Sequence, residues 1–272
     1  MILNAGALEN KGVDFQLSAI PIADYGNRVQ WVISANAAHN RNTIKKISNV
    51  LKKMNEANMS RPGAPLPIYE EGRSTSQLFT VPSLGIDPAT GKELYLKRNG
   101  MKTFVWNPTD KIAVGDTEPV MNGSVTSSFM YRSLTLSLAF QWEFGGYRYN
   151  STLVDKLENT SIAYNLDKRA LDGRWSEDNR LAQYKSISIL GSSTPQSSRF
   201  VQKFNELAFS SIAVGYRFDP KDMPFLRKYN IGAFSLNFSM QDLFRLSSVK
   251  QERGLDYPFA RSFNLSLSFL FN

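Results

Sequence analysis

The sequence predicts an all-β fold, an antiparallel transmembrane β-barrel of which this chain supplies about seven long strands and long extracellular loops. Three observations predict it. Apolar and polar residues alternate with period 2, the alternating segments are longer than ordinary strands, and short connections alternate with long ones. No apolar run among the 272 residues approaches the roughly 20 that a membrane helix needs.

The alternating segments are expected to belong to strands of about 10 to 13 residues each. In the last one, every second residue from Phe263 to Phe269 is apolar, and the residues between are Asn or Ser. Leu207 and Phe209 lie on the opposite phase from Ile212, which predicts a bulge near Ser210 and Ser211. The segments are 12–19, 29–37, 118–130, 133–144, 207–216, 234–240 and 262–271.

The connections between these segments alternate in length. The short ones are 21–27, 131–133 and 219–224. The longer ones are 41–117, 145–203 and 241–257. Connections beyond about 15 residues are uncommon in compact soluble domains, whereas outer-membrane barrels alternate short periplasmic turns with long external loops. The alternation therefore predicts a barrel wall whose three longer connections lie outside the cell.

The two faces of the predicted wall suit lipid and water. Leu136, Leu236 and Leu267 are expected to face lipid, while Ser137 and Ser235 face the barrel interior. Aromatic residues near the segment ends are expected to form girdles at the headgroup level. They are Trp142, Phe144, Tyr147, Tyr149, Tyr216 and Phe218. Because the polar face shows no charged cluster, we expect selectivity to reside in the two longest loops.

The long connections carry local signals of their own. Apolar residues at helical spacing predict a short amphipathic helix over residues 43–59. The proline-rich stretch 61–67 is expected to be extended and outside any central sheet. Residues 85–92 carry turn chemistry, but their glycines are spaced one residue too far apart for a phosphate-binding loop.

Large aromatic residues in the loops are the candidate site residues. Their faces suit sugar rings or apolar peptide side chains, and they equally suit packing between loops or docking of a protein partner. Docking or packing is the interpretation that we favour. The residues are Tyr69, Trp106, Tyr149 and Trp175.

The composition excludes several chemistries. The chain has 0 Cys, which excludes disulfides, thiol catalysis and thiolate metal sites. Its single His, His39, lacks identifiable catalytic partners and is expected to be a solvent-exposed or loop-base residue. Four loop carboxylates are expected to be solvated, with local salt bridges, because nothing sets the separation that a glycosidase pair needs. They are Asp167, Asp172, Glu177 and Asp178. We therefore expect no enzyme, no cofactor and no metal site.

The net charge of +8 raises the question of nucleic acid. The cations are scattered, the densest pairs being separated by neutral sequence, and no nucleic-acid motif accompanies them. A scattered basic surface, or one that faces acidic glycolipid, is the better interpretation. No nucleic-acid partner is expected.

Short motifs in a fixed order resemble one known family over nearly the whole chain. They begin with residues 8–14 and continue with Asn165, Asp167 and Arg169, followed by Arg174-Trp175. The later motifs are 197–201, 212–218, 241–248, 257–261 and the aromatic-ended terminal strand. Together they resemble the C-terminal β-barrel region of SusC/RagA-type TonB-linked outer-membrane transporters. The family pattern has Asn where Asp242 stands.

The resemblance implies a role in import of glycans or peptides across the outer membrane of a Gram-negative, Bacteroidetes-type bacterium. It implies a SusD-like surface lipoprotein as a partner, outer-membrane lipid around the wall, and energy from the TonB complex. Family members carry a signal peptide, a plug domain and a barrel of 22 strands. Residues 1–272 are accordingly expected to be the C-terminal part of such a barrel, with plug and signal peptide absent, so that TonB would act only through the missing N-terminal part.

Two other interpretations compete with a fragment of an importer. A secreted soluble β-sandwich that binds carbohydrate would also carry alternating strands and loop aromatics, but its strands would be shorter. A small self-contained porin would need an even number of strands, and about seven is odd.

Overall fold

The computed structural model describes residues 6–160, 163, 166–189, 193–221, 223–250 and 261–271. The chain divides into two compact units. The sheet unit comprises Gly12–His39, Val120–Phe144 and Asn205–Asn272. The loop unit comprises Met1–Lys11, Asn40–Pro119 and Gly145–Phe204.

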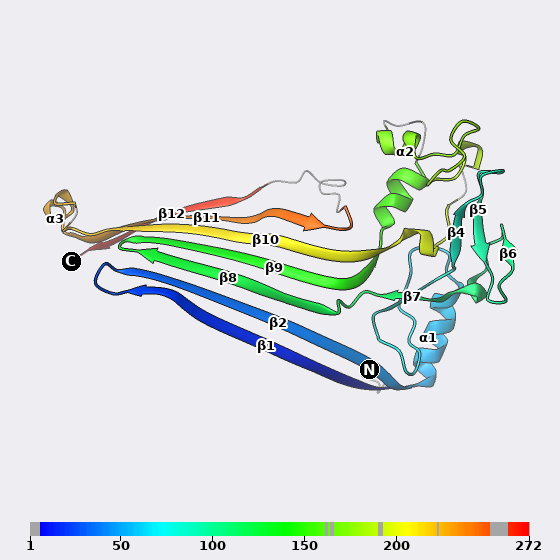
Figure 1. Ribbon diagram of the computed structural model, residues 1–272, viewed down its shortest axis with the longest axis horizontal. Helices are drawn as coiled ribbons and strands as arrows, with labels where there is room; N and C mark the ends of the chain where they lie inside the picture. Colours follow the sequence, from blue (N-terminus) through cyan, green and yellow to red (C-terminus); the bar gives the residue numbers. More distant parts are fainter. Residues whose placement is uncertain are drawn as a thin grey trace. The chain divides into compact units, whose positions relative to one another are not determined.

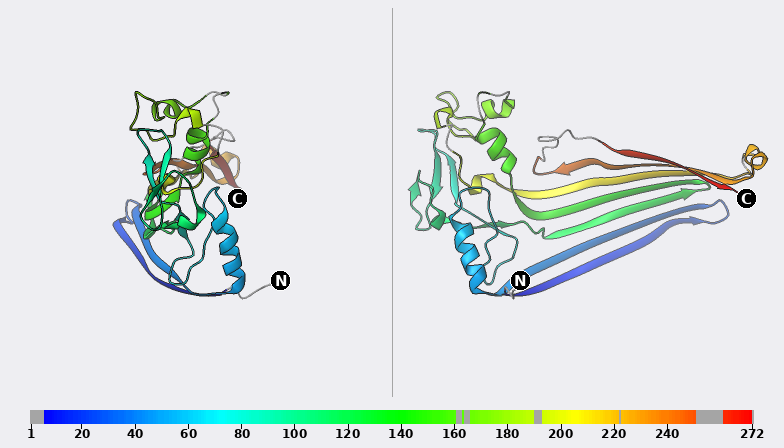
Figure 2. Two further views of the ribbon diagram at one scale, coloured as in Figure 1. Left: turned by 90° about the vertical axis from the view of Figure 1, so that its right-hand side faces the viewer. Right: turned by 180° about the vertical axis from the view of Figure 1, so that it is seen from behind.

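Long strands pair into one 7-stranded sheet with the order β1-β2-β8-β9-β10-β11-β12 (Figure 1). The register pairs recorded along it are antiparallel, and Figure 2 shows the same strands from behind. The predicted fold class and strand number are confirmed. The strands are β1 (Gly6–Asp24), β2 (Val29–Ile47), β8 (Met121–Tyr131), β9 (Leu134–Tyr149), β10 (Val201–Phe218), β11 (Ile231–Ser247) and β12 (Phe263–Phe271).

The register places the apolar positions of neighbouring strands opposite one another. Trp31 of β2 pairs with Phe129 of β8, which pairs with Leu136 of β9. Leu236 of β11 pairs with Leu267 of β12. Because side chains alternate along each strand, these pairs put the apolar residues on one face and the Ser, Thr and Asn residues on the other.

Aromatic rings continue this face from strand to strand. The ring of Phe234 stacks on Phe218 at 5.2 Å and on Phe269 at 4.9 Å, which joins β10, β11 and β12. Phe209 stacks on Phe140 of β9 at 4.6 Å between ring centroids. Such cross-strand pairs hold the register of a sheet.

The predicted bulge is confirmed. The register between β10 and β11 shifts between Phe209 and Ser211, and Asp242 on the opposite strand has a φ of 54°. The shift lets Phe209 and Ile212, which differ in sequence phase, share one face.

Little of the sheet unit is buried. Among its described hydrophobic residues only Ala208, Leu226, Ala233 and Val249 are buried. On the edge strands, Phe15 is 68% exposed and Phe263 is 72% exposed. The apolar face thus has no second layer among the described residues of this unit.

The loop unit contains two small sheets and most of the helices. β3 (Gln77–Thr80) pairs with β7 (Ile112–Asp116), and β5 (Glu93–Leu96) lies between β4 (Ser83–Ile86) and β6 (Lys102–Thr103). The helical segments are α1 (Asn49–Ser60), η1 (Pro108–Asp110), η2 (Leu153–Glu158), α2 (Lys168–Asp172), η3 (Ile187–Ile189) and η4 (Ser198–Phe200). The sheet unit adds α3 (Phe225–Lys228). No helix in the described part of the chain is long and apolar enough to cross a membrane.

The predicted helix over 43–59 is correct in kind but starts too early. β2 continues to Ile47 because Ile44 donates its N–H to the carbonyl of Arg73 at 2.9 Å and accepts from Gly72 at 2.8 Å. The helix begins after Ser48, whose hydroxyl accepts from Leu51 N at 3.3 Å and caps the first turn. A contact distant in sequence therefore overrides the helical pattern here.

The predicted loops are also shorter than 41–117, 145–203 and 241–257, because β2, β9, β10 and β11 extend into them. The stretch 61–67 lies outside every strand, as predicted, but it bends at residues 63 and 64 instead of running extended throughout. The turn at 85–92 is confirmed. In that turn Asp87 accepts from the hydroxyl of Thr90 at 2.6 Å, and Gly91 has a φ of 68°. Asn165 and residues 257–260 of the family motifs lie outside the described residues.

Candidate functional site

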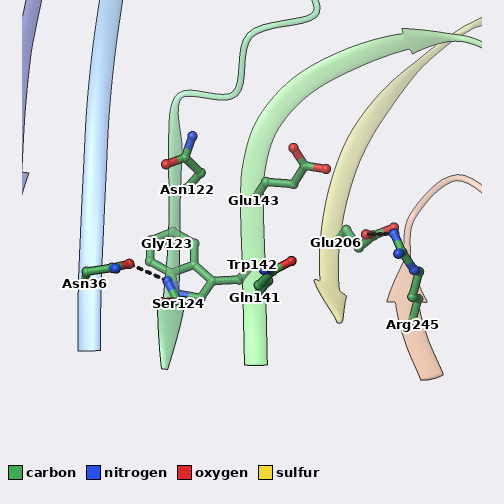
Figure 3. Close-up of a pocket in the computed structure, with 9 residues that line it drawn as sticks. All are labelled: Asn36, Asn122, Gly123, Ser124, Gln141, Trp142, Glu143, Glu206 and Arg245. Atoms are coloured by element: carbon green, nitrogen blue, oxygen red, sulfur yellow. Dashed lines mark hydrogen bonds and ion pairs between the residues drawn. The ribbon is translucent and has the colours of Figure 1, made fainter. Parts of the chain in front are cut away.

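A hollow of about 450 Å³ lies in the sheet unit across strands β2, β8, β9, β10 and β11 (Figure 3). Asn36 pairs with Ser124, which pairs with Gln141, so these three side chains form a row across β2, β8 and β9. The full lining is Asn36, Asn122, Gly123, Ser124, Gln141, Trp142, Glu143, Glu206 and Arg245.

Amide side chains dominate one end of the hollow. The side-chain oxygen of Asn36 accepts from Ser124 N at 2.6 Å, which fixes its orientation (Figure 3). Within the described chain, the exposed amides of Asn122 and Gln141 have no hydrogen-bond partner. These groups can donate to and accept from a ligand.

Charged side chains occupy the other end. The guanidinium of Arg245 donates to Glu206 at 2.9 Å and to Asp242 at 3.1 Å, and Glu143 lines the same hollow. The expectation that the polar face lacks a charged cluster was therefore wrong. The cluster depends on the pairing of β10 with β11, which aligns Ala208 with Arg245, and a single-strand pattern does not contain that pairing.

The loop unit is organised around a buried ion-pair cluster. The guanidinium of Arg199 bonds Glu93 at 2.9 Å and Glu158 at 2.7 Å, and both carboxylates are almost completely buried. Ser197 donates its hydroxyl to Glu93 at 2.6 Å. Burial by itself would lower the pKa of Arg199, but the hydrogen bonds and charges of the two carboxylates raise it. The cluster thus holds three loop segments together as a charged, hydrogen-bonded unit.

A buried arginine, Arg174, binds the carbonyl groups at the end of helix η2. Arg174 donates to the carbonyl oxygens of Ala170 at 3.0 Å and Lys185 at 3.1 Å, and also to that of Leu157. Burial lowers the pKa of Arg174, and the charge of Glu158 opposes this effect. Its donors satisfy carbonyls that a helix end leaves unpaired.

Of the four candidate aromatic residues, Trp106 lies at a cavity. It lines a hollow of about 290 Å³ together with Tyr95 and Phe104. Its indole N–H donates to the carbonyl of Gln196 at 2.9 Å, and the Lys111 ammonium lies 5.6 Å from its ring.

The other three candidates pack within the loops and are not gathered in one site. Trp175 donates to the carbonyl of Pro88 at 3.1 Å. The Tyr149 ring meets Phe200 edge-on at 6.2 Å. The N–H of Tyr69 bonds the side chain of Asn55 at 2.9 Å. A role for these residues in substrate or partner contact stays a prediction.

The histidine and the loop carboxylates that were considered as catalytic residues make local contacts near the surface. Exposed His39 places Nδ1 2.5 Å from the carbonyl oxygen of Val120. Asp167 pairs with Arg169 at 2.6 Å, and Asp172 pairs with Lys168 at 3.8 Å, as local salt bridges. No group of three or more potential metal ligands occurs within the described residues.

The residues of the sheet hollow were missed at the sequence level, although one signal was available. Asn36, Asn122, Ser124, Gln141 and Glu143 all fall on the polar phase of their strands. The alternation along each strand indicates that these side chains share the polar face of the sheet. Which of them lie next to one another depends on the register between the strands, which the alternation does not contain.

The comparisons bear on the fold. No family model and no curated protein sequence matches the chain. The solved structure of the RagAB peptide transporter matches with a TM-score of 0.70 at 20% identity, over 90% of this chain and 26% of that one. The structure of the RagAB peptide importer in the closed-closed state matches with a TM-score of 0.73 at 19% identity, over 98% of this chain and 30% of that one. The structure in the open-open state matches with a TM-score of 0.74 at 20% identity, over 98% of this chain and 29% of that one.

The chain has the fold of part of the RagAB barrel. At this level of identity the likeness shows the fold, and it confirms the structural side of the resemblance to SusC/RagA-type transporters. The chain spans less than a third of the length of the RagAB chains that it matches.

Proposed function

We propose that this chain forms part of the wall of an outer-membrane transporter barrel, with the apolar face of its sheet unit against lipid and the loop unit outside the cell. The observation that carries the proposal is the continuous apolar face, which no second layer covers within the described sheet unit. A lipid bilayer provides the apolar environment that such a face needs, and paired strands satisfy their backbone groups there.

The edges of the sheet also fit a larger barrel. With seven strands in antiparallel order, β1 and β12 run in the same direction, so they cannot pair with each other in the antiparallel manner. An odd number of further strands closes such a sheet into an even-stranded barrel. We propose that these strands come from the rest of the same transporter.

The cargo and partners follow by analogy with the matched proteins. RagAB is a peptide importer. We propose import of peptides or glycans without catalysis, with a SusD-like surface lipoprotein as partner and TonB as the source of energy.

A soluble β-sandwich is the second candidate, and it needs a second sheet against the apolar face. Flotation with lipid vesicles separates the two. We expect the refolded chain to float with vesicles and to precipitate without lipid or detergent, whereas a sandwich stays soluble and monomeric.

A matched pair of double variants locates the membrane face. Leu236→Asp with Leu267→Asp changes two residues that lie opposite one another on the apolar face, and Ser235→Asp with Ser268→Asp does the same on the polar face. The first variant should lose flotation and the second should retain it. The proposal would be contradicted if the parent chain failed to float, or if the serine variant lost flotation as the leucine variant does.

A further inference from the structure

The hollow in the sheet unit contains uncommitted amide groups in a regular arrangement. Asn122 and Gln141 are exposed in its lining, and their side chains have no hydrogen-bond partner within the described residues (Figure 3). A side-chain amide carries an acceptor oxygen and a donor nitrogen side by side. The same pair of groups is presented by the C=O and N–H of a peptide main chain.

The spacing of the polar groups matches an extended peptide. Asn122 and Ser124 lie two residues apart on one face of β8, and Gln141 and Glu143 lie two apart on β9, directly opposite them. Residues two apart in a strand are separated by about 6.8 Å. An extended ligand that lies along the strands presents its same-side main-chain groups at that same repeat of about 6.8 Å.

The charges of the hollow disfavour an anionic ligand group. Its guanidinium, on Arg245, is already bonded to Glu206 and Asp242, and Glu143 adds another carboxylate to the lining. An anionic group would therefore meet more negative than positive charge. The aromatic residue of the lining, Trp142, contacts Phe144 at 5.4 Å between ring centroids and shares its apolar phase.

Resting on the proposed function, we propose that this hollow binds the main chain of an extended peptide through the side-chain amides of Asn122 and Gln141. Because these amides would bind main-chain groups and not side chains, the hollow would accept peptides of different sequence. The acetamido group of an amino sugar shares the same chemistry, a secondary amide. The strand-like repeat of the polar groups favours the peptide.

The test measures binding of fluorescent probes to the full chain in detergent micelles by fluorescence anisotropy. The first probe is an uncharged heptapeptide of Ala, Ser and Gly. The second is the same peptide with alternate main-chain nitrogens methylated, which removes N–H groups but keeps the side chains. The third is an oligomer of N-acetylglucosamine. The double variant Asn122→Leu with Gln141→Leu removes both amides, and Asn264→Leu on β12 is the matched control, since it lies on the polar phase outside the hollow.

We expect the double variant to weaken binding of the plain peptide about tenfold or more, as two lost hydrogen bonds imply. The methylated peptide should bind the parent chain equally weakly, and Asn264→Leu should bind like the parent. Equal binding of the plain and methylated peptides would overturn the proposal, as would an equal loss in Asn264→Leu. Amide-dependent binding of the sugar oligomer alone would overturn the assignment to peptide. These results are distinct from failure of the proposed function, in which the parent chain does not float with vesicles.

Discussion

The sheet unit and the loop unit are stabilised in opposite ways. The loop unit buries Phe79, Val81, Leu157 and Phe200, and it encloses two buried carboxylates that pair with an arginine whose side chain is 11% exposed. The sheet unit leaves large residues such as Leu267 more than half exposed and buries few side chains among those described. The loop unit thus has a conventional interior, while the sheet unit depends on its surroundings for the burial that would stabilise it.

The two units should therefore respond to different kinds of substitution. In the loop unit the sensitive groups are inside, and the buried charges are stabilised by one another and by hydrogen bonds such as the one from Ser197 to Glu93. In the sheet unit the sensitive groups are outside, on the face proposed to contact lipid, while polar substitutions on the other face meet water.

Arg199→Met should cost about 3 to 5 kcal/mol of loop-unit stability, because it leaves Glu93 and Glu158 buried without their cation. Arg73→Met is the control, since the pair of Arg73 with Glu70 is exposed and should be worth about 1 kcal/mol or less. Urea unfolding followed by tryptophan fluorescence measures both. Equal costs would show that the buried cluster does not hold the loop unit together.

Leu138→Arg should cost about 2 to 4 kcal/mol in a bilayer, because it places a charge in the middle of the proposed lipid face. Ser137→Arg, one residue away on the polar face, should cost much less. The measurement is urea unfolding of the chain in lipid vesicles. A larger cost for Ser137→Arg would reverse the assignment of the two faces.

The two units also differ in how much the sequence predicted. Alternation is a local signal, so it indicated the strands, the two faces and even the bulge at Ser210 and Ser211. The cluster of Arg199, Glu93 and Glu158 joins residues distant in sequence, and no local pattern contains it. The same reason explains the hollow, since its residues could be assigned to a face but gather only through the register.

Gly123→Ala should cost about 1 to 3 kcal/mol through overpacking in the sheet unit. An added Cβ would meet the carbonyl oxygen of Asn36 and would lie 2.6 Å from Cζ2 of Trp142. Gly63→Ala in the loop unit is the control, because nothing lies within 4 Å of its added Cβ. A melting temperature unchanged in Gly123→Ala would mean that Trp142 does not lie across this glycine.

Lys111 should give the loop unit a modest pH dependence. Burial lowers its pKa from 10.5 to about 8, so the unfolded chain binds more protons than the folded chain between these values. Stability should therefore rise as the pH increases from 7 to 9.5. Lys111→Met should flatten this rise in the urea midpoint, while Lys53→Met, in an exposed position on α1, should leave it unchanged. A fall in the parent midpoint over this range would contradict the assignment.

Contact between lipid and one face of the sheet can be tested directly, because the chain has no native cysteine and single cysteines can be labelled. A fluorophore on Leu236→Cys or on Ser235→Cys reports on neighbouring positions of β11 that face opposite ways. In vesicles that contain brominated lipids, we predict strong quenching of the label at 236 and weak quenching at 235, with the reverse order for aqueous iodide. Equal quenching of the two labels by brominated lipid, or stronger quenching at 235, would contradict the account.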